Sequence, residues 1–411
     1  MNNIAVQKRW DIFCKVVDNF GDIGVCWRLA RQLQVEHGLQ IRLYVDNLDA
    51  ASQIITGLNK KQKNQIAQQV ELIFWQENTV FANDATVVIE AFSCGLPTQY
   101  LTQNQQVKWV NLEYLSAEKW VDDFHGKHSK LDGVPQKRHF FYPGFTAKTG
   151  GLIRESDMTS QLQNTSEASF PRKRESNFVR SSSWIPAFAG MTEDAITENV
   201  LKVSLFCYPS TPVHDLLNAL QFFSNPVFVY VPESGILPKV AEFFGKDAVN
   251  VGEKLTQNNL TVEVLPFLSQ TEYDILLHNC DINFVRGEDS WVRAIWAGKP
   301  FIWQPYFQTE DTHLLKLNAF LDVFYAEPNI GLSKPLSIDG FETKNRPKPL
   351  SMNNLRHLHI AWANNQPILT PIWQQYLQDL PHIASHTILQ SQNLANQPDL
   401  ASQLVSFCNI N

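Results

Sequence analysis

The stretch WDIFCKVVDNFGDIGVCWRLARQL, from Trp10 to Leu33, decides the fold class. Its first part, Trp10 to Val17, is an apolar run that predicts a buried strand, and the polar turn DNFGD (18–22) follows it. From about Val25 the apolar residues recur every four positions, which predicts a helix. A buried strand that leads through a short turn into a helix is the first half of a βαβ unit, and such units build parallel α/β sheets.

The same alternation continues along the chain in two series. The first series predicts further strands at 41–45, 70–75, 86–89, 107–111 and 139–142. The second series predicts strands at 203–208, 227–231, 260–267, 281–285 and 299–303, with helices between them. Because 411 residues exceed what one hydrophobic core holds, we expect two Rossmann-like domains that face a cleft.

Changes in pattern predict where the domains begin and end. Residues 1–155 are expected to form an N-terminal Rossmann-like domain and residues 200–365 a C-terminal one. Residues 156–199 lack periodicity and resemble translated copies of short palindromic genomic repeats, so we interpret them as an insertion or interdomain linker. The tail, 366–411, is expected to form helices that pack back across both domains.

Composition excludes several classes of protein. The net charge is −7, and no basic face of the kind that nucleic acid requires is visible, so no nucleic-acid partner is expected. The chain shows neither an apolar signal core nor a run long enough to span a membrane, which predicts a cytoplasmic protein without a membrane partner. Its six cysteines are scattered without metal-ligand spacing, which supports neither zinc nor a disulfide framework.

The turn after the first strand is one candidate site. It lies at the carboxyl end of a strand, where open α/β sheets bind ligands, and Gly21 would let the backbone approach a ligand closely. Asp18 and Asp22 would place two carboxylates at the mouth of the cleft. The alternative is structural: Asp22 caps the helix and Asp18 fixes the turn. With only Gly21 and Gly24, the turn is not a dinucleotide fingerprint.

The segment Arg286-Gly287-Glu288-Asp289-Ser290, between a predicted strand and a predicted helix, is a second candidate site. A helix N-terminus offers free N–H groups and partial positive charge to a diphosphate, to which Ser290 adds a hydroxyl and Arg286 a charge-assisted contact. Glu288 suits a ribose or a developing positive charge. The alternative is that Asp289 or Ser290 caps the helix and Arg286 pairs with Glu288 on the surface.

Aromatic side chains at strand ends of the second series add a base-binding candidate. Phe206, Tyr208 and Phe267 can stack on a base or meet its ribose, and Gln270 can hydrogen-bond a base edge. Their structural alternatives are core packing for the aromatics and an exposed first-turn position for Gln270. No DxD-type pair accompanies the phosphate candidates, so no metal and no cofactor are expected.

Together these residues resemble the bacterial protein-arginine rhamnosyltransferases that modify elongation factor P, the EarP family. The resemblance is carried by VVDNFGDIGVCWRLARQL (16–33) and FVRGEDSWVRAIWAGKPFIWQPY (284–306). It implies a GT-B fold and inverting transfer of L-rhamnose from dTDP-β-L-rhamnose to an arginine guanidine nitrogen of elongation factor P. That modification activates the factor for rescue of ribosomes stalled at polyproline.

The resemblance also implies a role for each matching residue. The N-terminal domain becomes the acceptor side, with Asp22 as general base, Asp18 beside the acceptor and Glu288 as a further catalytic residue. The C-terminal domain becomes the nucleotide-sugar-binding domain. The donor-binding residues are then Asn19, Phe20, Gly21, Phe206, Tyr208, Phe267, Gln270, Arg286, Gly287, Asp289, Ser290 and Tyr306.

Two other functions fit the same cleft. A GT-B glycosyltransferase or nucleotide-sugar epimerase that acts on a small or glycan acceptor would share the donor site but would not need elongation factor P. A non-catalytic nucleotide-sugar-binding protein would have little use for paired carboxylates facing a donor pocket.

Overall fold

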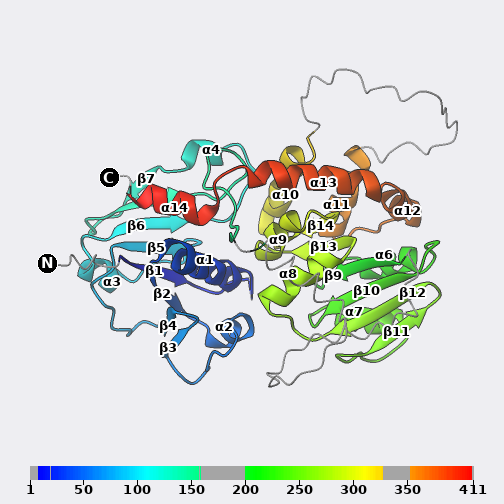
Figure 1. The fold of residues 1–411 in the computed structure, drawn as a ribbon, viewed down its shortest axis with the longest axis horizontal. Helices are drawn as coiled ribbons and strands as arrows, with labels where there is room; N and C mark the ends of the chain where they lie inside the picture. The colour runs from blue at the N-terminus through cyan, green and yellow to red at the C-terminus, as the bar shows by residue number, and fades with distance from the viewer. Residues whose placement is uncertain (1–7, 19, 157, 159–199, 327–351, 410–411) are drawn as a thin grey trace, which may run out of the picture.

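The computed structural model describes residues 8–18, 20–156, 158, 200–326 and 352–409. Asn19 and the predicted insertion, apart from Ser156 and Met158, therefore lie outside the described residues. The chain forms two α/β lobes that lie side by side (Figure 1). We call residues 8–156 the N-terminal lobe, and residues 200–326 with 352–395 the C-terminal lobe.

The N-terminal lobe is built on an eight-stranded sheet in the order β3-β4-β2-β1-β5-β6-β8-β7. Its central strands run parallel, and β3 and β7 pair antiparallel at the two edges. The strands are β1 (Arg9–Cys14), β2 (Gln40–Val45), β3 (Asn64–Ala67), β4 (Val70–Phe74), β5 (Val87–Ala91), β6 (Lys108–Leu112), β7 (His128–Lys130) and β8 (Lys137–Phe141).

The C-terminal lobe is built on a six-stranded sheet in the order β11-β12-β10-β9-β13-β14. All its neighbouring strands pair in parallel except β11, which is antiparallel to β12 at one edge. The strands are β9 (Leu201–Leu205), β10 (Val227–Pro232), β11 (Lys254–Gln257), β12 (Leu260–Leu265), β13 (Ile282–Arg286) and β14 (Phe301–Gln304). The α/β class and the two Rossmann-like sheets predicted from the sequence are confirmed.

Helices cover these sheets. In the N-terminal lobe they are α1 (Gly21–His37), α2 (Leu48–Ile54), α3 (Thr98–Gln103) and α4 (Val121–Phe124). In the C-terminal lobe they are α6 (Val213–Leu220), α7 (Leu237–Phe243), α8 (Gln270–Asn279), α9 (Asp289–Ala297), the 3-10 turn η2 (Thr309–Asp311), α10 (Thr312–Phe324), α11 (Met352–Ala363), α12 (Thr370–Gln378) and α13 (Leu380–Ala395). The last helix, α14 (Leu400–Asn409), follows α13 onto the N-terminal lobe (Figure 1).

The first strand and the first helix differ in extent from the sequence prediction. Strand β1 ends at Cys14 rather than Val17, and α1 begins at Gly21 rather than near Val25. The chain leaves the sheet early because side chains take over its N–H groups: Val16 donates to Asp46 Oδ1 at 2.9 Å and Val17 to Asp22 Oδ2 at 2.7 Å. The helix therefore starts within the DNFGD turn, and Asp22 lies in its first turn.

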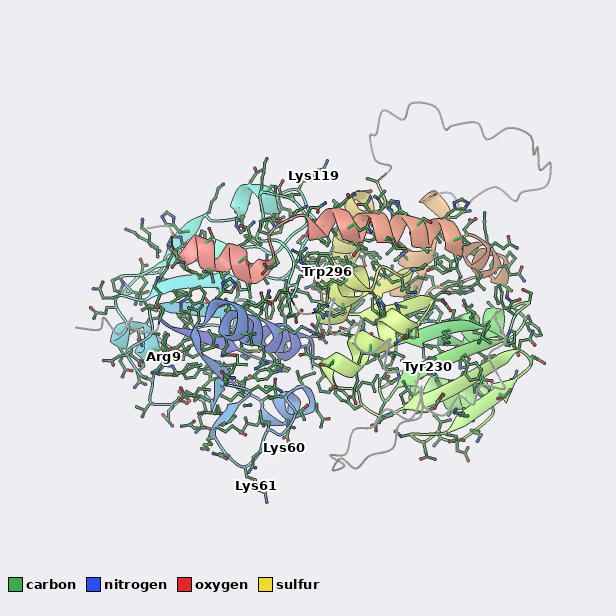
Figure 2. All side chains as sticks on the ribbon, viewed as in Figure 1. Arg9, Lys60, Lys61, Lys119, Tyr230 and Trp296 are labelled. Carbon is green, nitrogen blue, oxygen red and sulfur yellow. The ribbon has the colours of Figure 1, made fainter. Side chains whose placement is uncertain are left out.

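The two lobes are held together by buried polar contacts. Arg28 of α1 reaches across to Asp274 of α8 and Asp289 of α9, with Nε of Arg28 2.6 Å from Asp289 Oδ1 and its Nη2 2.9 Å from Asp274 Oδ1. Trp296, labelled between the lobes in Figure 2, donates its indole N–H to the Ile153 carbonyl oxygen at 2.8 Å. The structure therefore fixes how the two lobes face each other.

In each sheet the order of the strands reverses at the first strand, and this reversal places the ligand site. Strand β1 lies between β2 and β5, and β9 lies between β10 and β13. Such switch points bind ligands beyond the carboxyl ends of the strands. In this protein the two switch points meet, since the segment after β1 contacts the segment after β9 through Asp18 and Tyr208.

Candidate active site between the lobes

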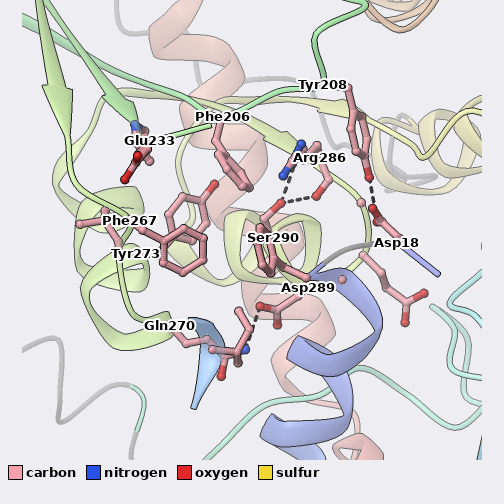
Figure 3. Close-up of a pocket in the computed structure, with 17 residues that line it drawn as sticks. Asp18, Phe206, Tyr208, Glu233, Phe267, Gln270, Tyr273, Arg286, Asp289 and Ser290 are labelled. Carbon is pink, nitrogen blue, oxygen red and sulfur yellow. Dashed lines mark hydrogen bonds between the residues drawn. The ribbon is translucent and has the colours of Figure 1, made fainter. Parts of the chain in front are cut away.

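A pocket that is partly open to solvent lies where the two switch points meet (Figure 3). It gathers residues from both predicted clusters and from the predicted aromatic set. The predicted residues that line it are Asp18, Phe20, Gly21, Phe206, Tyr208, Phe267, Gln270, Arg286, Gly287, Glu288, Asp289 and Ser290.

Asp18 reaches from the N-terminal lobe to the C-terminal lobe. Its Oδ2 accepts a hydrogen bond of 2.8 Å from the hydroxyl of Tyr208. Two glycines leave room for this carboxylate: a Cβ on Gly21 would lie 2.7 Å from Asp18 Oδ2, and one on Gly287 would lie 3.0 Å from it. Burial raises the pKa of Asp18, and the Tyr208 hydroxyl and the Arg286 charge oppose that rise.

Asp22 lies beneath the pocket rather than at its mouth. Its side chain is only 2% exposed, and its Oδ2 accepts hydrogen bonds from the backbone N–H groups of Val17 (2.7 Å) and Asp18 (2.9 Å). It does not cap α1, whose N-cap position is Phe20. Its other oxygen, Oδ1, accepts from the hydroxyl of Tyr114 at 3.2 Å. Burial raises the pKa of Asp22, against the opposing effect of the two N–H donors.

Glu288 faces the pocket from the C-terminal lobe and is held by the N-terminal one. Its Oε2 accepts a 3.0 Å hydrogen bond from the backbone N–H of Leu115. Burial raises the pKa of Glu288 to about 8, and the negative charges of Asp22 and Asp289 add to the rise. The Leu115 N–H and the ammonium of Lys316 oppose it. A carboxyl with a pKa near neutrality suits an acid–base role.

Arg286 is not paired with Glu288, contrary to the structural alternative considered above. Its guanidinium carbon lies 4.3 Å from the ring centre of Phe206 and 4.6 Å from that of Tyr208. Within the described parts of the chain the geometry gives Arg286 no carboxylate ion pair. Its charge is therefore held in place by two rings and remains available to a diphosphate.

The start of α9 differs from the structural alternative, in which Asp289 or Ser290 caps the helix. Glu288 occupies the N-cap position and makes no capping hydrogen bond, so neither Asp289 nor Ser290 is the cap. The Ser290 hydroxyl accepts from the backbone N–H of Arg286 at 3.0 Å and donates to its carbonyl oxygen, which closes the turn. A phosphate contact from this hydroxyl would have to replace one of these bonds.

Asp289 and Gln270 link the pocket to the other lobe. Asp289 Oδ1 pairs with Nε of Arg28 at 2.6 Å, and its Oδ2 accepts from the Gln270 amide at 3.1 Å. The same amide nitrogen donates to the Gly24 carbonyl oxygen at 3.1 Å. Gln270 is therefore not the exposed first-turn residue of the structural alternative, because its amide makes one contact across the lobes and one to Asp289.

The predicted aromatic residues form the wall on the C-terminal side. The rings of Phe20 and Phe267 meet edge to face across the lobes, with centroids 5.0 Å apart. Tyr306 is the exception, because it does not line the pocket and is 45% exposed. Its ring contacts Tyr208, which does line the pocket, with the centroids 5.8 Å apart.

Sequence reasoning missed several residues of the site. Those in the wall of the pocket are Ile54, Pro232, Glu233, Leu268 and Tyr273. Glu233 lies two residues and Tyr114 three residues beyond the end of a predicted strand, so the strand-end rule that selected Tyr208 would have found them only if it had been extended into the loop. Tyr273 lies one turn into a predicted helix and packs edge to face on Phe206, with centroids 5.4 Å apart, which no local pattern shows.

In the described residues no cluster of three or more His, Cys, Asp or Glu is arranged to hold a metal ion. That the reaction needs no metal stays a prediction. None of the described helices is both long enough and apolar enough to cross a bilayer.

Residues 10–409 match the sequence profile of the family described as Elongation-Factor P (EF-P) rhamnosyltransferase EarP. The chain belongs to this family. It is 38% identical to the protein-arginine rhamnosyltransferase of Pseudomonas putida, over 98% of this chain and 99% of that protein. It is 37% identical to that of Pseudomonas aeruginosa, over 97% of this chain and 98% of that protein.

Among solved structures, the chain is similar to one that gives the structural basis for EarP-mediated arginine glycosylation of translation elongation factor EF-P. The two share 30% sequence identity and a TM-score of 0.61, and the match covers 98% of each chain. The protein is therefore an enzyme, a glycosyltransferase with the GT-B fold. The two lobes described above are the two Rossmann-like halves of that fold.

Proposed function

We propose that the enzyme transfers L-rhamnose from dTDP-β-L-rhamnose to a guanidine nitrogen of an arginine of translation elongation factor P. Membership of the family supports the sugar and the acceptor class. The pocket supports the chemistry, because Arg286, with no carboxylate ion pair among the described residues, lines the same pocket as Asp18 and Glu288. This pairing of a cationic donor side with an anionic acceptor side is the observation that carries the proposal.

The donor side suits a nucleotide diphosphate. Arg286 and the N-terminus of α9 supply positive charge where the leaving diphosphate would develop negative charge. The aromatic wall formed by Phe206, Phe267 and Tyr273 offers ring faces and edges to a base. The donor would then lie mainly on the C-terminal lobe.

The acceptor side suits a guanidinium. A guanidinium has no free lone pair and a pKa above about 12, so a carboxylate must orient it and accept its proton as the bond to carbon forms. In a direct displacement the nitrogen bonds to the anomeric carbon while the carbon–oxygen bond to the diphosphate breaks, and its electron pair leaves on that oxygen. The β-linked donor then gives an α-linked product. We assign the base role to Asp22, whose Oδ2 is bound by two backbone N–H groups while its Oδ1 accepts only from the Tyr114 hydroxyl among the described residues.

The release of dTDP tests this function against the alternatives. We expect release from dTDP-rhamnose to require elongation factor P and to stop once each molecule of the factor has received one sugar. Arg286→Ala should weaken dTDP binding measured by calorimetry. Release at the same rate without the factor, or with a small or glycan acceptor alone, would support the other glycosyltransferase reading; interconversion of the sugar would support an epimerase.

A further inference from the structure

Tyr114 lies between two carboxylates that come from different lobes. It follows β6 in the N-terminal lobe, and its hydroxyl donates to Asp22 Oδ1 at 3.2 Å. The next residue, Leu115, donates its backbone N–H to Oε2 of Glu288 at 3.0 Å. Position 114 is therefore next to both the assigned base and the carboxylate of the opposite lobe.

One face of the Tyr114 ring is covered. The ring of Phe92 stacks on it with centroids 4.3 Å apart and an angle of 12° between the planes. Phe92 and Ser93 have φ angles of +56° and +55°, a conformation that costs energy for residues other than glycine and persists where the surroundings enforce it. Hydrogen bonds from Phe92 N to Leu112 O (2.7 Å) and from Ser93 N to Asn111 Oδ1 (3.2 Å) hold this geometry.

A cation lies over the other face. The ammonium of Lys316, from α10 of the C-terminal lobe, is 5.3 Å from the centre of the Tyr114 ring. Phe92 stacks at 4.3 Å on one side, so an ammonium over the ring must lie on the opposite side. The same ammonium is close enough to Glu288 to lower its pKa against the effect of burial.

The face of Tyr114 opposite Phe92 thus has three properties that attract a cation. The ring face is negative, and the carboxylates of Asp22 and Glu288 flank the position. A guanidinium suits it better than an ammonium, because a flat group can stack on the ring while its N–H groups reach sideways to carboxylates. Lysine, with a long flexible stem, can move its ammonium aside.

We infer that the acceptor guanidinium binds on the face of Tyr114 opposite Phe92, a binding site that we call the seat, and that Lys316 competes for this seat. This inference rests on the proposed function and adds to it a subsite for the arginine side chain. Tyr114 is then a positioning residue: its ring orders the guanidinium, and its hydroxyl orients Oδ1 of Asp22. Lys316 has to withdraw before the acceptor binds.

Steady-state kinetics with elongation factor P and saturating dTDP-rhamnose test the seat. Tyr114→Leu, which removes the ring, should raise KM for the factor roughly 2- to 30-fold, the range of a cation–ring contact. Tyr114→Phe, which keeps the ring, should leave KM within about twofold and lower kcat, since only the Asp22 contact is lost. The Kd for dTDP should be unchanged in both.

Lys316→Met provides a second test, because it removes the competing ammonium and leaves the Tyr114 ring unchanged. At pH 9, above the pKa of about 8 that Glu288 has with its lysine neighbour in place, this variant should lower KM for elongation factor P by about threefold or more. The matched control is Lys127→Met, because Lys127 also lies over a ring, 4.7 Å from the centre of Phe124, but outside the pocket. Its KM should equal that of the wild type.

The outcomes separate the seat from the proposed function. If the wild type transfers rhamnose but Tyr114→Leu leaves KM unchanged, the guanidinium binds elsewhere and the inference is overturned. A weaker Kd for dTDP in Lys316→Met would make Lys316 a donor ligand instead of a competitor, which also overturns it. Failure of the wild type to modify the factor would instead remove the proposed function.

Discussion

At the scale of single residues, the three catalytic candidates occupy three different environments. Asp18 is anchored to Tyr208 of the opposite lobe, Asp22 is buried under the turn, and Glu288 is bound by one N–H in the pocket. Carboxylates in unlike environments can take unlike roles in one reaction. We therefore expect their substitutions to differ in kind as well as in size.

Asp22→Asn should nearly abolish transfer. The amide oxygen can still accept from the N–H groups of Val17 and Asp18, so the fold should persist, but the proton acceptor is gone. Loss of a general base costs about 10²- to 10⁴-fold in rate, and loss of orientation adds to this. kcat, the melting temperature and the Kd for dTDP should be measured together.

Asp46→Asn is the matched control for that variant. Asp46 also accepts a backbone N–H of the same loop, from Val16 at 2.9 Å, but it does not line the pocket. Its transfer rate should stay near that of the wild type. An Asp22→Asn enzyme that kept a large fraction of wild-type kcat would show that Asp22 only holds the turn, and the base role would pass to Glu288 or Asp18.

Glu288 gives a pH dependence with a definite sign. Burial raises its pKa from 4.5 to about 8, so the folded protein keeps a proton that the unfolded chain releases above pH 4.5. The contribution of Glu288 to stability is thus fully present below pH 4.5 and is lost as pH rises through about 8. Lys316, Asp22, Asp289, Tyr114 and Cys26 are among the titratable groups that interact with it electrostatically.

Urea unfolding at pH 6 and pH 9 measures this dependence. The wild type should lose more stability between the two values than Glu288→Gln, which cannot ionise. In parallel, kcat/KM for elongation factor P should rise through about pH 8 in the wild type, because the ionised carboxylate attracts the guanidinium. An equal pH slope in the variant and the wild type would remove Glu288 as the titrating group.

At the scale of elements, two strand–turn–helix units make the site: β1 with α1, and β13 with α9. In the second unit Gly287 has a φ of +61°, and its missing side chain leaves the space in which Asp18 meets Tyr208. At Gly298, beyond the other end of α9, φ is +64° but the nearest atom to an added Cβ is 3.6 Å away. The two glycines thus share a backbone requirement and differ in surroundings.

Gly287→Ala should therefore lose transfer, while Gly298→Ala should not. Each substitution forces alanine into the left-handed region, at about 1 kcal/mol or more of stability. Only the alanine at 287 would also press on Asp18 Oδ2 at 3.0 Å and on the Tyr208 hydroxyl at 3.2 Å. Urea unfolding and kcat measured on both variants check this. Equal activities would mean that the Asp18–Tyr208 contact is dispensable.

Much of the arrangement of strands and helices was predictable from the sequence. Apolar strands followed by helices gave the central strands of both sheets, and the strand-end rule found Asp18, Tyr208 and Arg286. The short edge strands β3, β7 and β11 were missed, because three- and four-residue, largely polar segments such as NQIA, HSK and KLTQ are too short to show apolar alternation. The early start of α1 was missed because contacts of Asp22 and Asp46 outside any local periodicity end the strand.

At the scale of the whole molecule, an ionic cluster sets how the lobes meet. Arg28 and Arg293 share the carboxylates of Glu155 and Asp274, and Arg28 also binds Asp289. These partners lie up to 261 positions apart, so no sequence pattern could have predicted the cluster. The predicted domain boundaries stay a prediction, as do the limits of the insertion at 156–199.

Arg28→Ala should destabilise the protein strongly. It removes a buried cation from the partly buried carboxylates of Asp274, Asp289 and Glu155, and breaking a buried pair costs about 3–5 kcal/mol. Arg9→Ala is the control, because Arg9 pairs with Asp84 at the surface, where such a pair contributes about 0–1 kcal/mol. A similar small loss of unfolding free energy in both variants would show that the cluster does not hold the lobes together.

The central claim, rhamnosylation of an arginine, is tested most directly by mass spectrometry of elongation factor P incubated with the enzyme and dTDP-rhamnose. We predict a mass increase of one deoxyhexose, which fragmentation locates on a single arginine and which is absent with Asp22→Asn. An unchanged factor, or a deoxyhexose located on any residue other than arginine, would contradict the account.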